Sequence, residues 1–210
     1  MSNKKKIAES AISRLSVYLR ILEDLVEDDE LTVSSQTMAT HSGTTAAQVR
    51  KDLSLFGSFG RRGLGYSSSD LVLRIRRILG LNHRWKIAVI GMGRIGSALM
   101  EHRGFFERGF DIVALFDTSD FKVGSNVHGL QVYHVNQIRE IVHDKKIEIG
   151  VLTVPVEAVI DVTDLINGSG IRGILNWTPA RLAVSESIEV KNVNMVMELE
   201  ALSFKLSQSE

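Results

Sequence analysis

A glycine motif near the middle of the chain has the residue types and spacing of a nucleotide-binding loop. The apolar run Lys86 to Ile90, typical of a strand, leads directly into Gly91-Met92-Gly93-Arg94-Ile95-Gly96, and helix-forming residues follow as far as Met100. In this arrangement the backbone N–H groups and the positive end of the helix dipole face a bound pyrophosphate. The motif therefore predicts binding of a dinucleotide.

Each glycine of the motif has its own expected role. Gly91 makes the tight turn, Gly93 leaves room for the pyrophosphate beside the backbone, and Gly96 lets the helix pack closely against the strand. A second apolar run ends in Asp117, 21 residues after Gly96. Its carboxylate can accept hydrogen bonds from the adenosine ribose hydroxyls and would repel a 2'-phosphate. We therefore expect NAD or NADH rather than the phosphorylated coenzymes.

A segment upstream carries side chains that could recognise DNA. Thr45 and Gln48 have the spacing of a capping box, so a helix should begin there and extend to about Phe56. At 100° per residue, Val49, Leu53 and Phe56 share the face that would enter a core. The outward face carries Ala47, Lys51, Ser54 and Leu55 and is flanked by Gln48 and Arg50, so its polar and cationic side chains could reach base edges and phosphates. Taken alone, such a face is more often simply solvated.

The residues after this helix favour DNA binding over a face that is simply solvated. Gly57 to Tyr66 contain four glycines and the pair Arg61 and Arg62, which predicts a short hairpin with arginines at its tip. Such a tip can contact backbone phosphates or enter a narrow minor groove, where the negative potential is enhanced. Together with two earlier helices, near residues 12–26 and 34–42, the segment predicts a winged helix-turn-helix.

Two composition regimes divide the chain into two predicted domains. Residues 1–83 are expected to be mainly helical and to end in a connector helix over residues 70–81. Residues 84–210 alternate strand-like and helical stretches, and strands beyond the first two are expected near 130–133, 148–154, 172–176 and 188–193. We therefore expect an α/β protein with an N-terminal winged-helix domain followed by a Rossmann dinucleotide-binding domain.

The length of the second predicted domain disfavours an enzyme. Six strands with their helices fill residues 86–210, which leaves no length for a substrate domain, and the chain has no Ser-x-x-x-Tyr-x-x-x-Lys arrangement. The dinucleotide would then be a signal rather than a substrate. A small NAD-dependent oxidoreductase with an N-terminal interaction module is the alternative, and a structural nucleotide-binding subunit that never meets DNA is a third interpretation.

Net charge and composition limit the kinds of site and the cellular location that we expect. The chain carries 25 Lys and Arg against 25 Asp and Glu, yet residues 41–85 hold eight basic residues against two acidic ones, a local net charge of +6. There is no cysteine, and the six histidines show no metal-ligand spacing, so we expect no metal site. No apolar run approaches the length of a membrane span, and no signal-peptide core follows the N-terminal lysines, so we expect a cytoplasmic protein.

The C-terminal segment carries an apolar stripe. Met195, Leu199, Leu202 and Leu206 recur at helical spacing and must bury against something. The helix could cap its own sheet, which is the more common outcome, or cross to a second subunit. The spacing alone does not decide between these outcomes.

Several motifs taken together resemble the Rex family of redox-sensing transcriptional repressors. They are Gln48-Val49-Arg50-Lys51-Asp52-Leu53-Ser54, the segment Gly57 to Tyr66, the glycine motif Gly91 to Gly96, Leu152-Thr153-Val154-Pro155 and Gly173-Ile174-Leu175-Asn176-Trp177-Thr178-Pro179. The similarity extends over about residues 8–206. It implies a homodimer that binds pseudo-palindromic double-stranded operator DNA and is released when NADH accumulates, with the C-terminal helix swapped between subunits.

The resemblance also implies roles for individual residues. DNA contacts would come from Gln48, Arg50, Lys51, Ser54, Arg61 and Arg62. The adenosine and pyrophosphate part of the coenzyme would bind Gly91, Met92, Gly93, Arg94, Ile95, Gly96 and Asp117. The nicotinamide end would be lined by Thr153, Val154, Pro155, Asn176, Thr178 and Pro179. Leu55 and Asn194 depart from the family's usual Tyr and Asp.

An apolar nicotinamide pocket would explain a response to redox state. The oxidised ring carries a positive charge, which burial without a carboxylate partner penalises. Val154, Pro155 and Trp177, with Met195 from a second copy, are the expected lining of this pocket. NADH should then bind more tightly than NAD.

Overall fold

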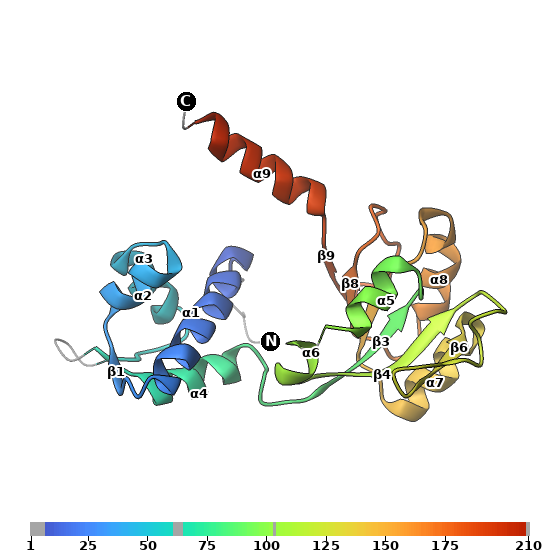
Figure 1. Ribbon diagram of the computed structural model, residues 1–210, viewed down its shortest axis with the longest axis horizontal. Helices are drawn as coiled ribbons and strands as arrows, with labels where there is room; N and C mark the ends of the chain where they lie inside the picture. The colour runs from blue at the N-terminus through green and yellow to red at the C-terminus, as the bar shows by residue number, and fades with distance from the viewer. Residues whose placement is uncertain (1–6, 61–64, 103, 209–210) are drawn as a thin grey trace. The chain divides into compact units, whose positions relative to one another are not determined.

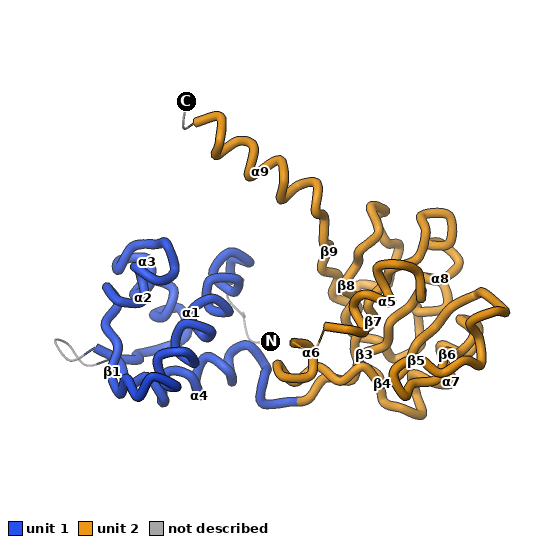
Figure 2. Tube along the Cα trace, in the orientation of Figure 1, with its two compact units in different colours: residues 1–83 blue, residues 84–210 orange. Residues whose placement is uncertain are grey.

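The structure is a computed structural model that describes residues 7–60, 65–102 and 104–208 of the chain. The chain divides into two compact units, residues 1–83 and 84–210, each with its own hydrophobic core (Figures 1 and 2).

The first unit is a small helical domain. Its helices are α1 (Glu9–Glu27), α2 (Ser35–Ser42), α3 (Ala46–Ser54) and α4 (Ser68–Ile78), and its short strands β1 (Thr32–Val33) and β2 (Tyr66–Ser67) pair antiparallel. The core is built from apolar residues of all four helices, among them Leu15, Leu22, Met38, Leu53 and Ile75. The predicted helix-turn-helix is confirmed by α2 and α3.

The turn between α2 and α3 follows from local capping. Gly43 has a φ of 64°, the left-handed conformation that ends α2, and its N–H donates to Ala39. The Thr45 hydroxyl then accepts from the N–H of Gln48 and begins α3. The third helix ends two residues before the predicted Phe56, and the predicted connector helix over 70–81 begins at Ser68.

The hairpin expected after α3 lies partly outside the described residues. Residues 57–60 form no strand, and β2 pairs with β1, which lies between α1 and α2. The sequence did not reveal β1 because a two-residue strand has no readable periodicity. Residues 61–64, with the predicted DNA contacts Arg61 and Arg62, lie outside the described residues.

The second unit is built on a seven-stranded sheet in the order β5-β6-β4-β3-β7-β8-β9. The strands are β3 (Trp85–Ile90), β4 (Phe110–Asp117), β5 (Asn126–Val127), β6 (Leu130–His134), β7 (Ile149–Leu152), β8 (Gly173–Asn176) and β9 (Glu189–Asn192). All six predicted strands are present and pair in parallel, while the antiparallel edge strand β5 was not predicted.

Taken in chain order, the six parallel strands have the spatial order 3-2-1-4-5-6 of a Rossmann fold. Helices α5 (Arg94–Met100), α6 (Gly104–Glu107), α7 (Ile138–Lys145), α8 (Val159–Ile166) and α9 (Met195–Ser207) belong to this unit, with single 3-10 turns at Val135–Gln137 and Val156–Ala158. The chain reverses direction across the sheet between β3 and β7, which is where such folds bind ligands.

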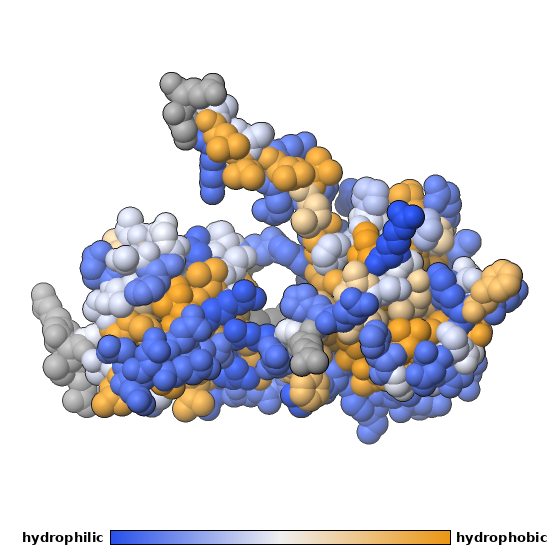
Figure 3. Space-filling view, in the orientation of Figure 1, coloured by the Kyte–Doolittle hydropathy of each residue, from blue (hydrophilic) through white to orange (hydrophobic). Residues whose placement is uncertain are grey.

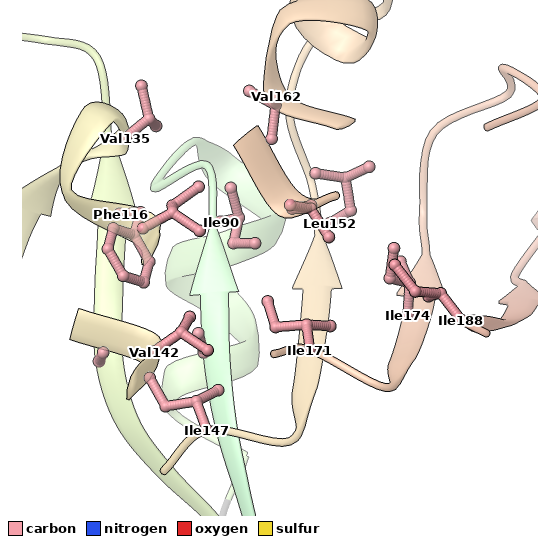
Figure 4. Packing of buried hydrophobic residues seen from close by; sticks show 14 residues of the cluster. Ile90, Phe116, Val135, Val142, Ile147, Leu152, Val162, Ile171, Ile174 and Ile188 are labelled. Atoms are coloured by element: carbon pink, nitrogen blue, oxygen red, sulfur yellow. The ribbon is translucent and has the colours of Figure 1, made fainter. Parts of the chain in front are cut away.

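Both faces of the sheet are covered. Ile90, Phe116 and Leu152 point to the face that α7 and α8 cover, where they pack with Val142 and Val162 (Figure 4). Alternate residues of the same strands, such as Val89 and Leu115, form a second cluster on the other face. Burial on both faces explains why the central strands are continuous apolar runs rather than alternating ones.

Candidate functional site

The glycine motif forms the loop between β3 and α5, at the reversal point of the sheet. The N–H of Gly91 donates to the carbonyl oxygen of Phe116 in β4, at 2.8 Å. The Thr153 hydroxyl, just after β7, donates to the Gly91 carbonyl oxygen at 2.6 Å. Both neighbouring strands therefore fix the start of the loop.

The three glycines have three different environments. Gly91 has a φ of 99°, and a Cβ there would lie 2.9 Å from the backbone of Thr153. At Gly96 a Cβ would lie 2.0 Å from the Gly91 carbonyl oxygen. At Gly93 a Cβ would meet nothing within 4 Å, and the backbone is extended. The fold itself therefore requires Gly91 and Gly96, whereas at Gly93 it leaves open space.

Asp117 ends β4 beside this loop. Its Oδ2 accepts from the N–H of Met92 at 2.8 Å and from Lys122 Nζ at 3.1 Å, and its Oδ1 accepts from the N–H of Ser119 at 2.9 Å. Burial alone would raise the pKa of Asp117, but these hydrogen bonds outweigh it and hold the pKa below its usual value. Asp117 is thus an ionised carboxylate whose Oδ1 retains room for another donor.

A cavity of about 540 Å³ opens between the glycine loop and the ends of β4 and β7. This volume is in the usual range of ligand pockets. Its lining comprises Gly91, Gly93, Arg94, Ile95, Asp117, Thr118, Lys122, Val135, Thr153, Val154, Pro155, Ala158 and Val162. Eight predicted coenzyme residues therefore share one cavity, with a carboxylate at one part and an apolar wall at another.

Five predicted coenzyme residues lie elsewhere. The side chain of Met92 is buried in the cluster that contains Val89 and Leu115, and Gly96 packs inside α5. At the end of β8, Asn176 is fully buried, and its Oδ1 accepts from both the N–H and the hydroxyl of Thr178. Thr178 and Pro179 line a separate hollow of about 370 Å³ beside Asn194. In this single chain, Asn176 organises the turn after β8 rather than lining the cavity.

Trp177, expected at the nicotinamide end, does not line this cavity of the single chain. Its ring packs with Val89, Leu115 and Val151 on the sheet face opposite to Val162, and it is absent from the cavity lining. The apolar wall of the cavity is instead completed by Ala158 and Val162 beside Val154 and Pro155. The alternation of strand residues across a sheet explains this placement, because Trp177 follows Asn176 by one position.

Lys122 is a site residue that sequence reasoning missed. Its Nζ donates to the carbonyl oxygen of Met92 at 2.8 Å as well as to Asp117, so it joins the glycine loop to the end of β4. One of its three N–H groups remains for a ligand. A lysine in a polar loop five residues after a strand gives no sequence signal, and only the folded loop brings it to the cavity.

Helix α3 presents the predicted DNA-contacting side chains. Arg50, Lys51 and Ser54 are exposed, and Val49 and Leu53 are buried on the opposite side. Arg50 donates to the hydroxyl of Ser35 at the start of α2, at 3.0 Å. Gln48 is half-buried, and its Nε2 donates to Asp52 at 2.7 Å. Arg50, Lys51 and Ser54 therefore share the outer side of the second helix of a helix-turn-helix, and Gln48 lies at the edge of that side.

Helix α4 braces the segment after α3. The Arg74 guanidinium lies 5.5 Å from the centre of the Phe59 ring and donates to the Ser58 carbonyl oxygen at 3.4 Å. A hollow of about 550 Å³ separates this segment from α3 and is lined in part by Arg50, Ser54 and Tyr66.

Other kinds of site are not evident in the described ranges. Among residues 7–60, 65–102 and 104–208, no cluster of three or more His, Asp or Glu side chains could hold a metal ion. Within the same ranges, no helix has both the length and the apolar character to cross a membrane.

Comparison with known proteins agrees with both units. Residues 82–180 match the family described as CoA binding domain, and residues 6–54 match the family described as putative DNA-binding protein N-terminus. A redox-sensing transcriptional repressor Rex from Syntrophomonas wolfei is 44% identical, covering 96% of both chains. The same repressor from Carboxydothermus hydrogenoformans is 43% identical, covering 96% of this chain and 97% of its own.

Two solved structures are similar over nearly the whole chain. A crystal structure of RSP in complex with beta-NAD+ and operator DNA has a TM-score of 0.91 and 30% identity, and covers 98% of this chain and 95% of its own. A crystal structure of RSP in complex with beta-NADH has a TM-score of 0.87 and 29% identity, covering 98% and 97%.

Fold, site and relatives define a class: a transcriptional regulator that joins a winged-helix domain to a Rossmann domain. Within that class, the chain belongs to the Rex family of redox-sensing transcriptional repressors. The resemblance inferred from the sequence motifs is confirmed. The alternative of an oxidoreductase loses its support, because the relatives are repressors.

Proposed function

We propose that this chain is a cytoplasmic repressor that binds NAD(H) in the cavity beside the glycine loop and operator DNA through α3. The observation that carries the proposal is the open space at Gly93, in a loop that the neighbouring strands otherwise fix. The fold has no need of a glycine there, but a pyrophosphate approaching the backbone does. Titration of NADH and of NAD into a complex of the protein with operator DNA tests the whole proposal.

The residues of the cavity fit the adenosine end of a dinucleotide. The N-terminus of α5 and the loop N–H groups would hold the pyrophosphate. Asp117 Oδ1 would accept from one ribose hydroxyl, and the remaining N–H of Lys122 would donate to the same ribose. Because Asp117 already accepts three hydrogen bonds, the ribose is shared between these two residues rather than held by the carboxylate alone.

The apolar wall would distinguish the two redox states. The coenzyme supplies the difference, because its oxidised nicotinamide carries one positive charge more than the reduced ring. Val154, Pro155, Ala158 and Val162 offer that ring no carboxylate, so burying the charged form costs free energy that the neutral form avoids. NADH should therefore bind more tightly than NAD.

Helix α9 would make the dimer. No residue of α9 is buried in this chain, and apolar side chains gather along it (Figure 3). Met195, Leu199, Leu202 and Leu206 are each at least 51% exposed. Asn194 caps the helix by accepting from the N–H groups of Val196 and Met197. A second copy of the chain would cover this surface and would also pair two α3 helices for a two-fold symmetric operator.

The charge balance around the ribose predicts coenzyme preference. Asp117→Ala should raise affinity for NADPH by about tenfold or more relative to NADH, because it removes a negative charge and leaves the Lys122 ammonium beside a 2'-phosphate. Calorimetric titration of both coenzymes measures the ratio. Asp120→Ala, an exposed carboxylate three residues on, is the matched control and should leave the ratio unchanged.

A further substitution isolates the part that Lys122 has in this effect. Lys122→Met added to Asp117→Ala should remove the gain in NADPH binding. An unaltered coenzyme ratio in Asp117→Ala would exclude Asp117 from the ribose site. A gain that survives Lys122→Met would assign the phosphate to another cation.

A further inference from the structure

The carboxylate of Asp52 lies on the inner side of α3 and is fully engaged by hydrogen bonds. Its side chain is 2% exposed. Oδ2 accepts from Arg14 Nε at 2.6 Å and from the Tyr18 hydroxyl at 3.0 Å. Oδ1 accepts from Arg14 Nη2 at 2.8 Å and from Gln48 Nε2 at 2.7 Å. Each oxygen therefore accepts two hydrogen bonds, the usual capacity of an ionised carboxylate.

The hydrogen bonds around Asp52 keep its carboxylate ionised and keep the hydroxyl of Tyr18 protonated. Burial alone would raise the pKa of Asp52, but the hydrogen bonds from Arg14, Gln48 and Tyr18 outweigh it and hold the pKa below its usual value. Burial and the hydrogen bond to Asp52 raise the pKa of Tyr18 to about 12, so its hydroxyl keeps the proton that it donates. Asp52 is thus an ionised group that can only accept.

An ionised Asp52 restricts the orientation of the Gln48 amide. The two ends of a free glutamine amide differ in chemistry but hardly in shape, and an exposed glutamine can turn either end toward DNA. An acceptor-only neighbour at 2.7 Å admits only the NH₂ end. Gln48 therefore donates one N–H to Asp52, and its Oε1 and its second N–H remain available for another partner.

We propose that Asp52 is a specificity-determining residue that orients the Gln48 amide so that an acceptor and a donor remain for an adenine in the major groove. An adjacent acceptor and donor match the N6 amino group and N7 of adenine, whereas guanine presents two acceptors. Arg14, which donates to both oxygens of Asp52, acts through it as a positioning residue. The inference rests on the proposed function, since it requires that α3 reads DNA.

The test measures base preference, which a purely structural role would leave unchanged. Full-length protein is used to select from a duplex library with randomised half-sites. Wild type should prefer adenine at one position in each half-site, and Gln48→Ala should lose that preference. Asp52→Asn, whose amide no longer dictates the orientation of Gln48, should reduce the same preference by about fivefold or more while preferences at other positions persist.

Two variants separate orientation from general damage. Tyr18→Phe removes one donor from Asp52 but leaves the contact with Gln48, so the adenine preference should persist. Lys51→Ala should lower affinity for all sequences alike and reduce the salt dependence, as expected for loss of a phosphate contact. Wild-type adenine preference in folded Asp52→Asn, or equal loss in Tyr18→Phe and Asp52→Asn, would overturn the proposal.

A further measurement covers the case in which Asp52→Asn does not fold. ¹⁵N relaxation of the Gln48 side-chain amide in free wild-type protein should show an ordered group, and free rotation there would also overturn the proposal. If wild type selects no sequence at all, the proposed DNA-binding function fails as well. If wild type selects a sequence that Gln48→Ala leaves unaltered, only the inference fails.

Discussion

Gly93→Val should weaken NADH binding by at least about 100-fold while leaving the melting temperature of the protein nearly unchanged. The site at Gly93 is open, with nothing within 4 Å of the position that a Cβ would take, so the folded chain accommodates the side chain. The valine would instead occupy the space where a pyrophosphate approaches the backbone. Fluorescence titration of NADH and thermal unfolding measure the two quantities separately.

Gly96→Ala is the matched comparison, because it adds only a methyl group to the same motif. Its Cβ would lie 2.0 Å from the Gly91 carbonyl oxygen, so the helix must shift away from the loop. We expect a lower melting temperature together with weaker NADH binding. If Gly93→Val bound NADH as wild type does, the pyrophosphate would have to lie elsewhere and the proposed coenzyme site would be wrong.

Leu199→Glu combined with Leu202→Glu should convert the dimer into monomers and abolish tight operator binding. Burying one leucine contributes about 1.5–3 kcal/mol, and a two-fold interface loses four at once, so association should weaken by at least about 100-fold. Both side chains are exposed within one chain, at 64% and 51%, so its fold should survive. Sedimentation velocity measures the association, and fluorescence anisotropy with operator DNA measures its consequence.

The control for this prediction adds the same charge to another side of the helix. By helical periodicity, Ala201 of α9 and Gln208, the residue directly after the helix, lie on the side away from Leu199 and Leu202. Ala201→Glu combined with Gln208→Glu should remain dimeric. A Leu199→Glu, Leu202→Glu variant that stays dimeric would show that α9 is not the interface.

Long elements with strong periodicity were predictable from the sequence. The run Lys86 to Ile90 is buried on both faces of the sheet and therefore reads as continuously apolar, and the glycines after it reveal the turn into α5. Three of the predicted cavity residues, Thr153 to Pro155, follow β7 because parallel strands end at one edge of the sheet. The glycine loop was therefore predictable from the residues alone, whereas Thr153 to Pro155 were named through the resemblance to the Rex family.

Features that depend on the path of a loop or on the rotation of one side chain were not predictable from the sequence. The pairing of β1 with β2 joins Thr32 to Ser67 and Val33 to Tyr66, which are far apart in the sequence, without any local signal. Lys122 reaches the cavity only because the loop after β4 turns back toward Met92. The position of Trp177 beside Val89 and Leu115 could not be predicted, because strand parity is not visible in an apolar run. Gln48 looked free on a helical projection, which shows no hydrogen bond to Asp52.

The most direct test of redox sensing by this chain is a comparison of the two coenzyme forms on one operator complex. Full-length dimer bound to labelled operator DNA is titrated with NADH and, separately, with NAD, and the operator affinity is measured at saturation. NADH should weaken operator binding by about 5- to 150-fold, which corresponds to a coupling of about 1–3 kcal/mol, and NAD should do so much less. Equal effects of NADH and NAD, or no effect of either, would contradict the claim that this chain couples redox state to DNA binding.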